Sequence, residues 1–213
     1  HFDSSHGMLE YAAKYSTYAS SVAALGELRF HHTLDKLALV GTPCQIMTIR
    51  KMQAMNIVPS DTIAICLGLF CSGNFTFSAD LFTRLEETYG FQYREVEKIN
   101  IKESFIFSLP GGRQVEIPIQ EFADVKRPAC NFCTDFSAEY ADISFGGIGA
   151  PKNWTTVMTR TPLGKAVFAD ALEKVLVPFK YEDNPKYVTQ AEEKVFGASA
   201  EKQRQAKENR AQR

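Results

Sequence analysis

The chain lacks a charge imbalance, a long apolar run and a recognisable targeting segment. Its 213 residues carry 24 Lys and Arg against 25 Asp and Glu, a formal net charge of −1. Charge therefore gives no reason to expect nucleic-acid or membrane binding. No apolar run reaches the roughly 20 residues of a membrane-spanning helix, and residues 1–6 lack the apolar stretch of a secretory signal. We expect a cytoplasmic protein with no integral membrane segment and no nucleic-acid partner.

The residues of a hydrolytic site are missing as well. The four histidines stand at positions 1, 6, 31 and 32, away from the motifs described below. No Ser–His–Asp arrangement and no metal-hydrolase motif is visible. We therefore assign no catalytic acid, base or nucleophile.

Cysteines, in contrast, stand at informative places. Cys44 lies in VGTPCQ, Cys71 in GLFCSGNF, and Cys130 and Cys133 form a C-x-x-C pair in RPACNFC. Four thiolates suit zinc or an iron–sulfur cluster. Because the chain has five cysteines, an odd number, and the protein is expected inside the cell, ligands are favoured over disulfides.

The arrangement of the four cysteines favours iron–sulfur over zinc. Zinc ribbons usually bring two C-x-x-C pairs, whereas this chain has one pair and two separate cysteines. A non-catalytic docking module stabilised by zinc remains the alternative. Cys66, the fifth cysteine, lies inside an apolar run and would face away from Cys71 on a regular strand, so we interpret it as a core residue.

The hydrophobic pattern predicts an α/β fold, with a mostly parallel sheet flanked by helices and an inserted antiparallel hairpin. Cys44 and Cys71 follow two predicted strands, and ligands collect beyond the carboxyl ends of strands in such sheets. We expect strands at 37–40, 62–70, 142–145 and 154–159, helices at 45–55, 77–89 and 162–175, and alternating strands of the insertion at 96–102, 104–109 and 113–119.

The last part of the chain differs in composition. Residues 191–213 are rich in Glu, Lys, Arg, Gln and Ala, and Val195 and Phe196 are their only sizeable apolar residues. This composition predicts a solvated helix or a disordered tail with little to bury. We therefore divide the chain into a domain at 1–181 and a tail at 182–213.

Four motifs in this order and spacing resemble the beta-subunit family of coenzyme F420 hydrogenases and dehydrogenases. They are the segment around Cys44, the segment from Gly68 to Phe75, the C-x-x-C segment 130–136, and residues 141–149 followed by 154–157. The resemblance runs from about Lys14 to about Glu173, roughly three quarters of the chain. A lone C-x-x-C is a weak motif, but four motifs in family order are specific.

The resemblance implies a flavoprotein that carries FAD and a 4Fe-4S cluster and passes electrons between a reduced deazaflavin, coenzyme F420, and an iron–sulfur chain. Cys44, Cys71, Cys130 and Cys133 would hold the cluster in a loop. Members of the family serve as subunits of redox complexes such as hydrogenase or formate dehydrogenase. Others use ferredoxin or a tetrapyrrole, so the resemblance leaves the donor and the acceptor open.

The flavin site is implied by the same resemblance. Its expected residues are Lys14, Tyr15, Ser16, Thr42, Asn74, Gly146, Gly147, Gly149, Trp154, Thr155 and Thr156. Glycine loops supply amide donors for a pyrophosphate, and residues 146–149 follow a predicted strand. Because the chain has no initiator Met and family members carry a longer amino-terminal part, we expect a fragment of a longer protein.

Overall fold

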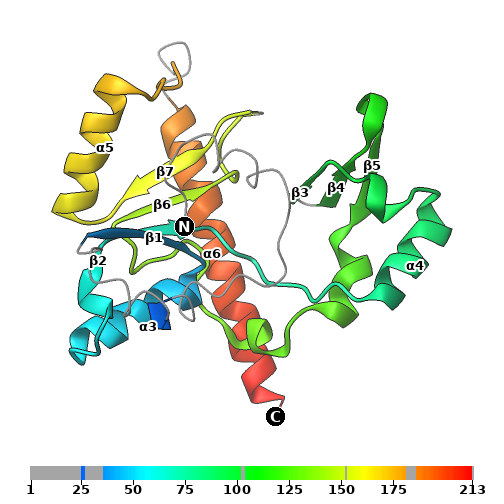
Figure 1. Cartoon of the computed structure of the whole chain (residues 1–213), viewed down its shortest axis with the longest axis horizontal. Coiled ribbons are helices and arrows are strands. Elements are labelled where there is room, and N and C mark those ends of the chain that lie inside the picture. The colour runs from blue at the N-terminus through cyan, green and yellow to red at the C-terminus, as the bar shows by residue number, and fades with distance from the viewer. Residues whose placement is uncertain (1–24, 27–35, 102–103, 152, 181–185, 213) are drawn as a thin grey trace. The chain divides into compact units, whose positions relative to one another are not determined.

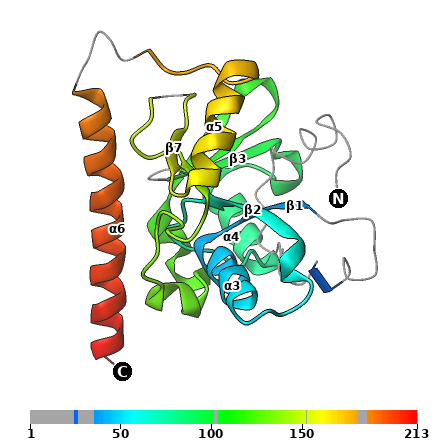
Figure 2. The same cartoon turned by 90° about the vertical axis from the view of Figure 1, so that its left-hand side faces the viewer.

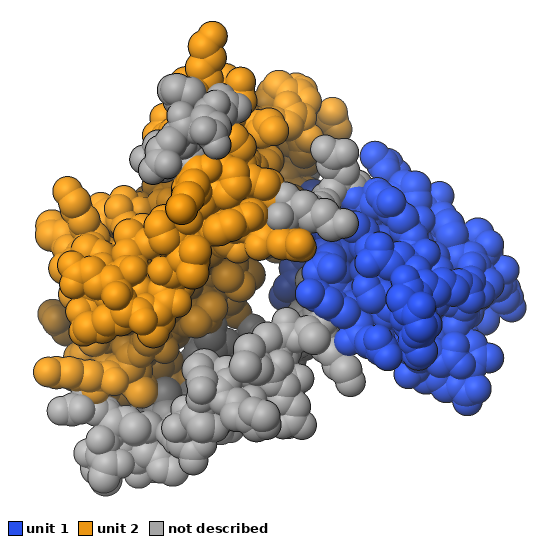
Figure 3. Space-filling model, turned by 90° about the horizontal axis from the view of Figure 1, so that it is seen from above, with its two compact units in different colours: residues 1–19, 73–127 blue, residues 20–72, 128–213 orange. Residues whose placement is uncertain are grey.

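The computed structural model describes residues 25–26, 36–101, 104–151, 153–180 and 186–212. The chain divides into two compact units (Figure 3). Unit 1 comprises residues 1–19 and 73–127, and unit 2 comprises residues 20–72 and 128–213. All four cysteines of the predicted cluster, and the glycine loop 146–149, belong to unit 2.

Unit 2 is built on a four-stranded sheet (Figure 1). Its strands are β1 (Leu37–Gly41), β2 (Ile63–Leu69), β6 (Ile143–Gly146) and β7 (Thr156–Thr159), in the order β1-β2-β6-β7. β1 and β6 both run parallel to β2, and β7 pairs antiparallel with β6. The predicted mostly parallel sheet is confirmed.

The core of unit 2 lies between this sheet and helix α3 (Pro43–Ala54). Ile46 and Ile49, one turn apart on α3, are fully buried against Leu39 and Ile63 of the sheet. Cys66 is fully buried in the same cluster, so it packs as a small apolar residue. α3 begins at Pro43, whose fixed φ suits the first helical position.

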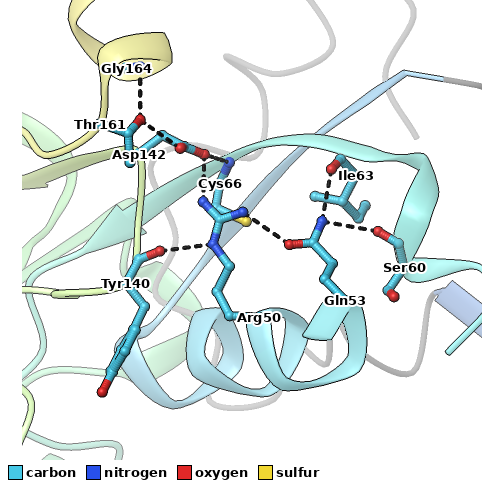
Figure 4. A network of polar contacts seen from close by, with 9 residues as sticks. All are labelled: Arg50, Gln53, Ser60, Ile63, Cys66, Tyr140, Asp142, Thr161 and Gly164. Carbon is cyan, nitrogen blue, oxygen red and sulfur yellow. Dashed lines mark hydrogen bonds and ion pairs between the residues drawn. The ribbon is translucent and has the colours of Figure 1, made fainter. Parts of the chain in front are cut away.

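A buried polar network joins α3 to the start of β6 (Figure 4). The carboxylate of Asp142 accepts hydrogen bonds from the Cys66 amide at 2.7 Å, the Arg50 guanidinium at 2.8 Å and the Thr161 hydroxyl at 2.7 Å. Thr161 in turn caps helix α5 (Pro162–Lys174) by accepting from the Gly164 amide at 3.1 Å. This network ties α3 and α5 to the sheet, and α5 confirms the helix predicted at 162–175.

Unit 1 has a separate aromatic core. Its three-stranded antiparallel sheet consists of β3 (Lys98–Ile101), β4 (Ser104–Ser108) and β5 (Gln114–Pro118), beside helix α4 (Ala79–Tyr89). The alternating apolar residues of the predicted strands at 104–109 and 113–119 are buried in this core: Phe105, Phe107, Val115 and Ile117. α4 ends at Gly90, whose φ of 66° is the left-handed conformation that favours glycine.

The charged segment near the end of the chain forms one straight helix, α6 (Tyr187–Ala211), coloured orange to red in Figure 2. Val195, Lys202 and Ala206 are buried, and these positions lie on one face because they are seven and four residues apart. α6 therefore contacts the rest of unit 2 through a narrow face, while most of its other residues are exposed. Among the described residues, no helix is both long and apolar enough to cross a membrane.

Candidate functional site

Cys44 and Cys71 lie just beyond the carboxyl ends of two neighbouring strands. Gly41 of β1 pairs with Gly68 of β2 in parallel register, so both strands end at the same edge of the sheet. Cys44 is the second residue of α3, with its sulfur 3.3 Å from the Thr42 hydroxyl. Cys71 follows the last residue of β2 by two positions. The structure thus places both cysteines where the strand pattern predicts them.

The C-x-x-C pair lies in a tight loop. Cys130 is in the short helix η5 (Pro128–Phe132), and the Cys133 amide donates to the Cys130 carbonyl at 3.4 Å. The Cys133 sulfur lies 3.6 Å from the carbonyl oxygen of Asp135. The amide of Cys71 donates to the carbonyl of Phe136 at 2.8 Å. The end of β2 is therefore fastened directly to the segment that follows the cysteine pair.

Side chains of helix α6 donate hydrogen bonds to backbone carbonyls of the same segments. The Lys202 ammonium donates to the carbonyl oxygens of Cys71 at 2.5 Å and of Asp135 at 2.9 Å. Asn209 and Arg210 of α6 donate to the carbonyls of Asn131 and Phe132, at 2.8 and 2.9 Å. These contacts were not predicted from the sequence. The sequence signal that could have indicated them is the spacing of four residues between Ala198, Lys202 and Ala206, which places the lysine on one helix face with two alanines.

The burial of the cysteines separates Cys66 from the other four. Cys44 is exposed, and Cys71, Cys130 and Cys133 are half-buried. Cys66 is fully buried, and burial raises the pKa of its thiol above the ordinary value. A buried neutral thiol is a poor ligand. The four remaining cysteines have the donor chemistry of an iron–sulfur site, with the accessibility that cluster insertion needs.

In the described part of the chain, no group of three or more His, Cys, Asp or Glu side chains is arranged to hold a metal ion. The predicted set of Cys44, Cys71, Cys130 and Cys133 is therefore not assembled into a closed site. The four cysteines stand on three segments. The hydrogen bond from the Cys71 amide to the Phe136 carbonyl joins the segment of Cys71 to the segment that follows Cys133. The assignment of these cysteines as ligands stays a prediction.

The glycine loop that follows β6 has a packing role at two of its positions. A Cβ atom on Gly146 would lie 1.9 Å from the ring of Phe70, and one on Gly149 would lie 2.9 Å from the carbonyl oxygen of Ala191 in α6. Gly149 also has a φ of 82°. Gly147 has open space where a Cβ would be, so its backbone is the most accessible part of the loop.

The surroundings of this loop are aromatic and hydrogen-bonded. The Tyr187 hydroxyl of α6 donates to the Gly149 carbonyl at 2.8 Å, and the Thr156 hydroxyl donates to the Ile148 carbonyl at 2.7 Å. Trp154 is 37% exposed, so it does not fill the core, and its ring meets Phe179 edge-on at 5.0 Å. An exposed aromatic ring can stack on a planar ligand.

The remaining predicted flavin residues stand on other segments of the chain. Lys14, Tyr15 and Ser16 lie outside the described residues. Asn74 belongs to unit 1, where its carbonyl accepts from the Arg127 amide at 2.8 Å. Thr42 stands beside Cys44, and its amide donates to the Gln45 side chain at 2.9 Å. Thr42 and the loop 146–149 follow the carboxyl ends of β1 and β6, which both run parallel to β2 in one sheet, and the assignment of the flavin residues stays a prediction.

Gly68, near the end of β2, has a packing role in the structure. A Cβ on Gly68 would lie 2.3 Å from the Cβ of Ala138 and 2.8 Å from that of Ala141. Both alanines are buried in the core of unit 2. The glycine is therefore required by the packing of the segment after the C-x-x-C pair against β2.

Comparison with known proteins identifies relatives of this chain. Residues 34–184 match the family model for the C terminus of the coenzyme F420 hydrogenase/dehydrogenase beta subunit. The chain is 31% identical over 160 residues to the coenzyme F420 hydrogenase subunit beta of Methanothermobacter thermautotrophicus, a match that covers 74% of this chain and 57% of that protein. It is 32% identical over 177 residues to the same subunit of Methanococcus voltae, covering 82% of this chain and 62% of that protein.

A solved structure shares the fold. A chain of the F420-reducing NiFe hydrogenase complex from Methanosarcina barkeri superimposes with a TM-score of 0.82 at 24% identity, over 98% of this chain and 72% of that one. At this identity the likeness bears on the fold alone. The chain spans about three fifths of the length of the two hydrogenase subunits that it matches.

Proposed function

Because the chain belongs to the coenzyme F420 hydrogenase/dehydrogenase beta-subunit family, we propose that it is an electron-transfer part of an oxidoreductase. It carries electrons between a two-electron donor of the deazaflavin type and an iron–sulfur chain. FAD and one 4Fe-4S cluster are its cofactors. Its partners are the other subunits of a redox complex, and its location is the cytoplasm.

The observation that carries this proposal is the placement of the four cysteines. Cys44 and Cys71 stand at one edge of the sheet, beyond neighbouring parallel strands. The segment after the C-x-x-C pair is hydrogen-bonded to Cys71. Cys130 and Cys133 would complete the set of four thiolates that a cubane cluster requires. A bound cluster supplies one-electron chemistry, and the protein fixes its place and its surroundings.

The proposed flavin site is supported by the loop at 146–149 and its neighbours. Gly147 leaves its backbone open, so its amide can approach a phosphate group. Thr156 and Tyr187 hold the loop by its carbonyls, while Trp154 offers an exposed ring. Thr42, Asn74, Thr155 and the segment Lys14–Ser16 are the other proposed contacts.

Metal and sulfide analysis of protein purified without oxygen tests the proposal. We expect about four irons and four sulfides per chain, the composition of one cubane cluster. Cys130→Ser should lose most of this iron, while Cys66→Ala, a substitution in the buried core, should retain it. One zinc per chain without sulfide would contradict the proposal and leave a structural module. After reconstitution with FAD, reduction of the protein by reduced deazaflavin or reduced ferredoxin, and reoxidation of the reduced protein by a tetrapyrrole, then distinguish the possible redox partners.

A further inference from the structure

Lys202 is a buried cation of helix α6. Its relative exposure is 8%, in a helix whose other lysines at 194 and 207 are exposed. Within the described part of the chain, no carboxylate forms an ion pair with it. Burial of an ammonium is costly unless other groups replace its hydration. A specific interaction must therefore keep this lysine in the interior.

The partners of Lys202 are two carbonyl oxygens from different segments. One belongs to Cys71, beyond the end of β2, and the other to Asp135, two residues after Cys133. The two carbonyl dipoles accept from two of the three N–H groups of the ammonium but leave its positive charge uncancelled. Anions placed at these two segments would be stabilised by that charge, because Coulomb interactions are stronger in a partly buried site than in water.

The rest of α6 supports the same loop. Lys202, Ala206 and Asn209 succeed one another at spacings of four and three residues, so they lie on one face of the helix. Asn209 donates to the Asn131 carbonyl inside the C-x-x-C sequence. α6 lies after residue 184, where the match to the family model ends. The match to the family model therefore assigns no role to Lys202.

We propose that Lys202 is a positioning residue that fastens the Cys71 segment to the loop after the C-x-x-C pair and places a positive charge beside their thiolates. The electrostatic part of this inference rests on the proposed iron–sulfur function. The positioning part does not, because it concerns hydrogen bonds that the chain forms without any cofactor.

Hydrogen exchange of the full chain without its cluster tests the positioning. Lys202→Met keeps the length of the side chain and removes its ammonium, and Lys207→Met, at an exposed position of the same helix, is the matched control. We expect the Cys71 amide and the amides of 130–136 to exchange about tenfold faster in Lys202→Met, since hydrogen bonds to charged groups are the stronger ones. Lys207→Met should exchange like the parent chain. Equal rates in the two variants would overturn the positioning role.

The midpoint potential of the cluster tests the charge. In cluster-containing protein, Lys202→Met should have a more negative potential than the parent chain, because a nearby cation favours the reduced, more negative cluster. Lys202→Arg keeps the charge and should restore the potential. A potential that is unchanged in Lys202→Met would overturn the electrostatic role. A parent chain that binds no cluster would refute the proposed function and this electrostatic role, while the exchange rates still decide the positioning.

Circular dichroism identifies a variant that has lost its helices. If Lys202→Met has lost its helices, the exchange rates of Lys202→Ala are compared with those of Lys207→Met instead, since alanine fits the face that carries Ala206. Faster exchange at Cys71 and 130–136 alone supports the proposal, and uniformly faster exchange throughout unit 2 overturns it.

Discussion

Two aspartates of the chain differ sharply in what their polar contacts contribute. Asp142 is buried and accepts three hydrogen bonds, from a backbone amide, a guanidinium and a hydroxyl. Asp124 of unit 1 also pairs with an arginine, Arg84, but both side chains are about half exposed, at 58% and 47%. Surface pairs contribute little because water screens them. The two aspartates therefore form a natural comparison.

We predict that Asp142→Ala lowers the free energy of unfolding by about 3 kcal/mol, because it removes the acceptor of the buried Cys66 amide and of the Thr161 hydroxyl and one of the three acceptors of the Arg50 guanidinium. Asp124→Ala should leave the stability close to that of the parent chain. Urea denaturation followed by circular dichroism measures both. Equal midpoints for the two variants would show that the Asp142 network does not hold α3 and α5 to the sheet.

Among the elements, two helical glycines occupy opposite environments. A Cβ on Gly164, in the first turn of α5, would lie 2.1 Å from the carbonyl oxygen of Asp142. A Cβ on Gly197, inside α6, would meet no atom within 4 Å. The first glycine permits α5 to pack closely on the start of β6, whereas the second has no such requirement.

Substitution by alanine should therefore have opposite effects. Gly164→Ala is expected to destabilise the protein by about 1–3 kcal/mol through overpacking against a backbone atom. Gly197→Ala is expected to stabilise it by about 1 kcal/mol, the difference in helix propensity. Thermal unfolding of both variants checks the signs. A gain in stability for Gly164→Ala would mean that α5 moves away from Asp142 at little cost.

Helix α6 shows why composition was insufficient to predict its packing. The segment has few large apolar side chains, which predicts a solvated helix. Its buried face, however, uses Val195, Lys202 and Ala206, and a small residue such as Ala206 allows a close approach. A lysine among buried positions cannot be recognised from charge content alone. The position of the helix depends on carbonyl acceptors near Cys71 and Cys133, which are remote in the sequence.

Strands and helices near the cysteines were, in contrast, predictable. Short apolar runs before Gly-Thr-Pro and before Cys71 predicted β1 and β2, and the pattern of the sequence predicted a helix at 162–175, where α5 lies. These signals are local. Two contacts depend instead on residues that are far apart in the sequence: the hydrogen bond between Cys71 and Phe136, and the packing of Phe70 on Gly146. Their partners can only be found from the folded chain.

The molecule as a whole has two separate cores. Phe107, in β4, is fully buried among the aromatic residues of unit 1, and Ile49, in α3, is fully buried in unit 2. Loss of a buried phenylalanine typically costs about 3–5 kcal/mol. Such a loss acts on the cooperative unit that contains the residue.

Hydrogen exchange should report this division. In Phe107→Ala, we expect faster exchange in β4 and β5, with little change in β1 and β2. Ile49→Ala, the reciprocal variant, should accelerate β1 and β2 and leave β4 and β5 close to the parent rates. Acceleration of all four strands to the same extent in either variant would show that the two cores unfold as one.

The central claim is that four cysteines of this chain hold a cluster that accepts electrons. Electron paramagnetic resonance of the anaerobically purified protein, before and after chemical reduction, tests it most directly. We predict a signal of a reduced 4Fe-4S cluster that appears on reduction, is lost or altered in Cys44→Ser, and persists in Cys66→Ala. A protein that shows no such signal, or one whose signal survives unchanged in serine variants of Cys44, Cys71, Cys130 and Cys133, would contradict the claim.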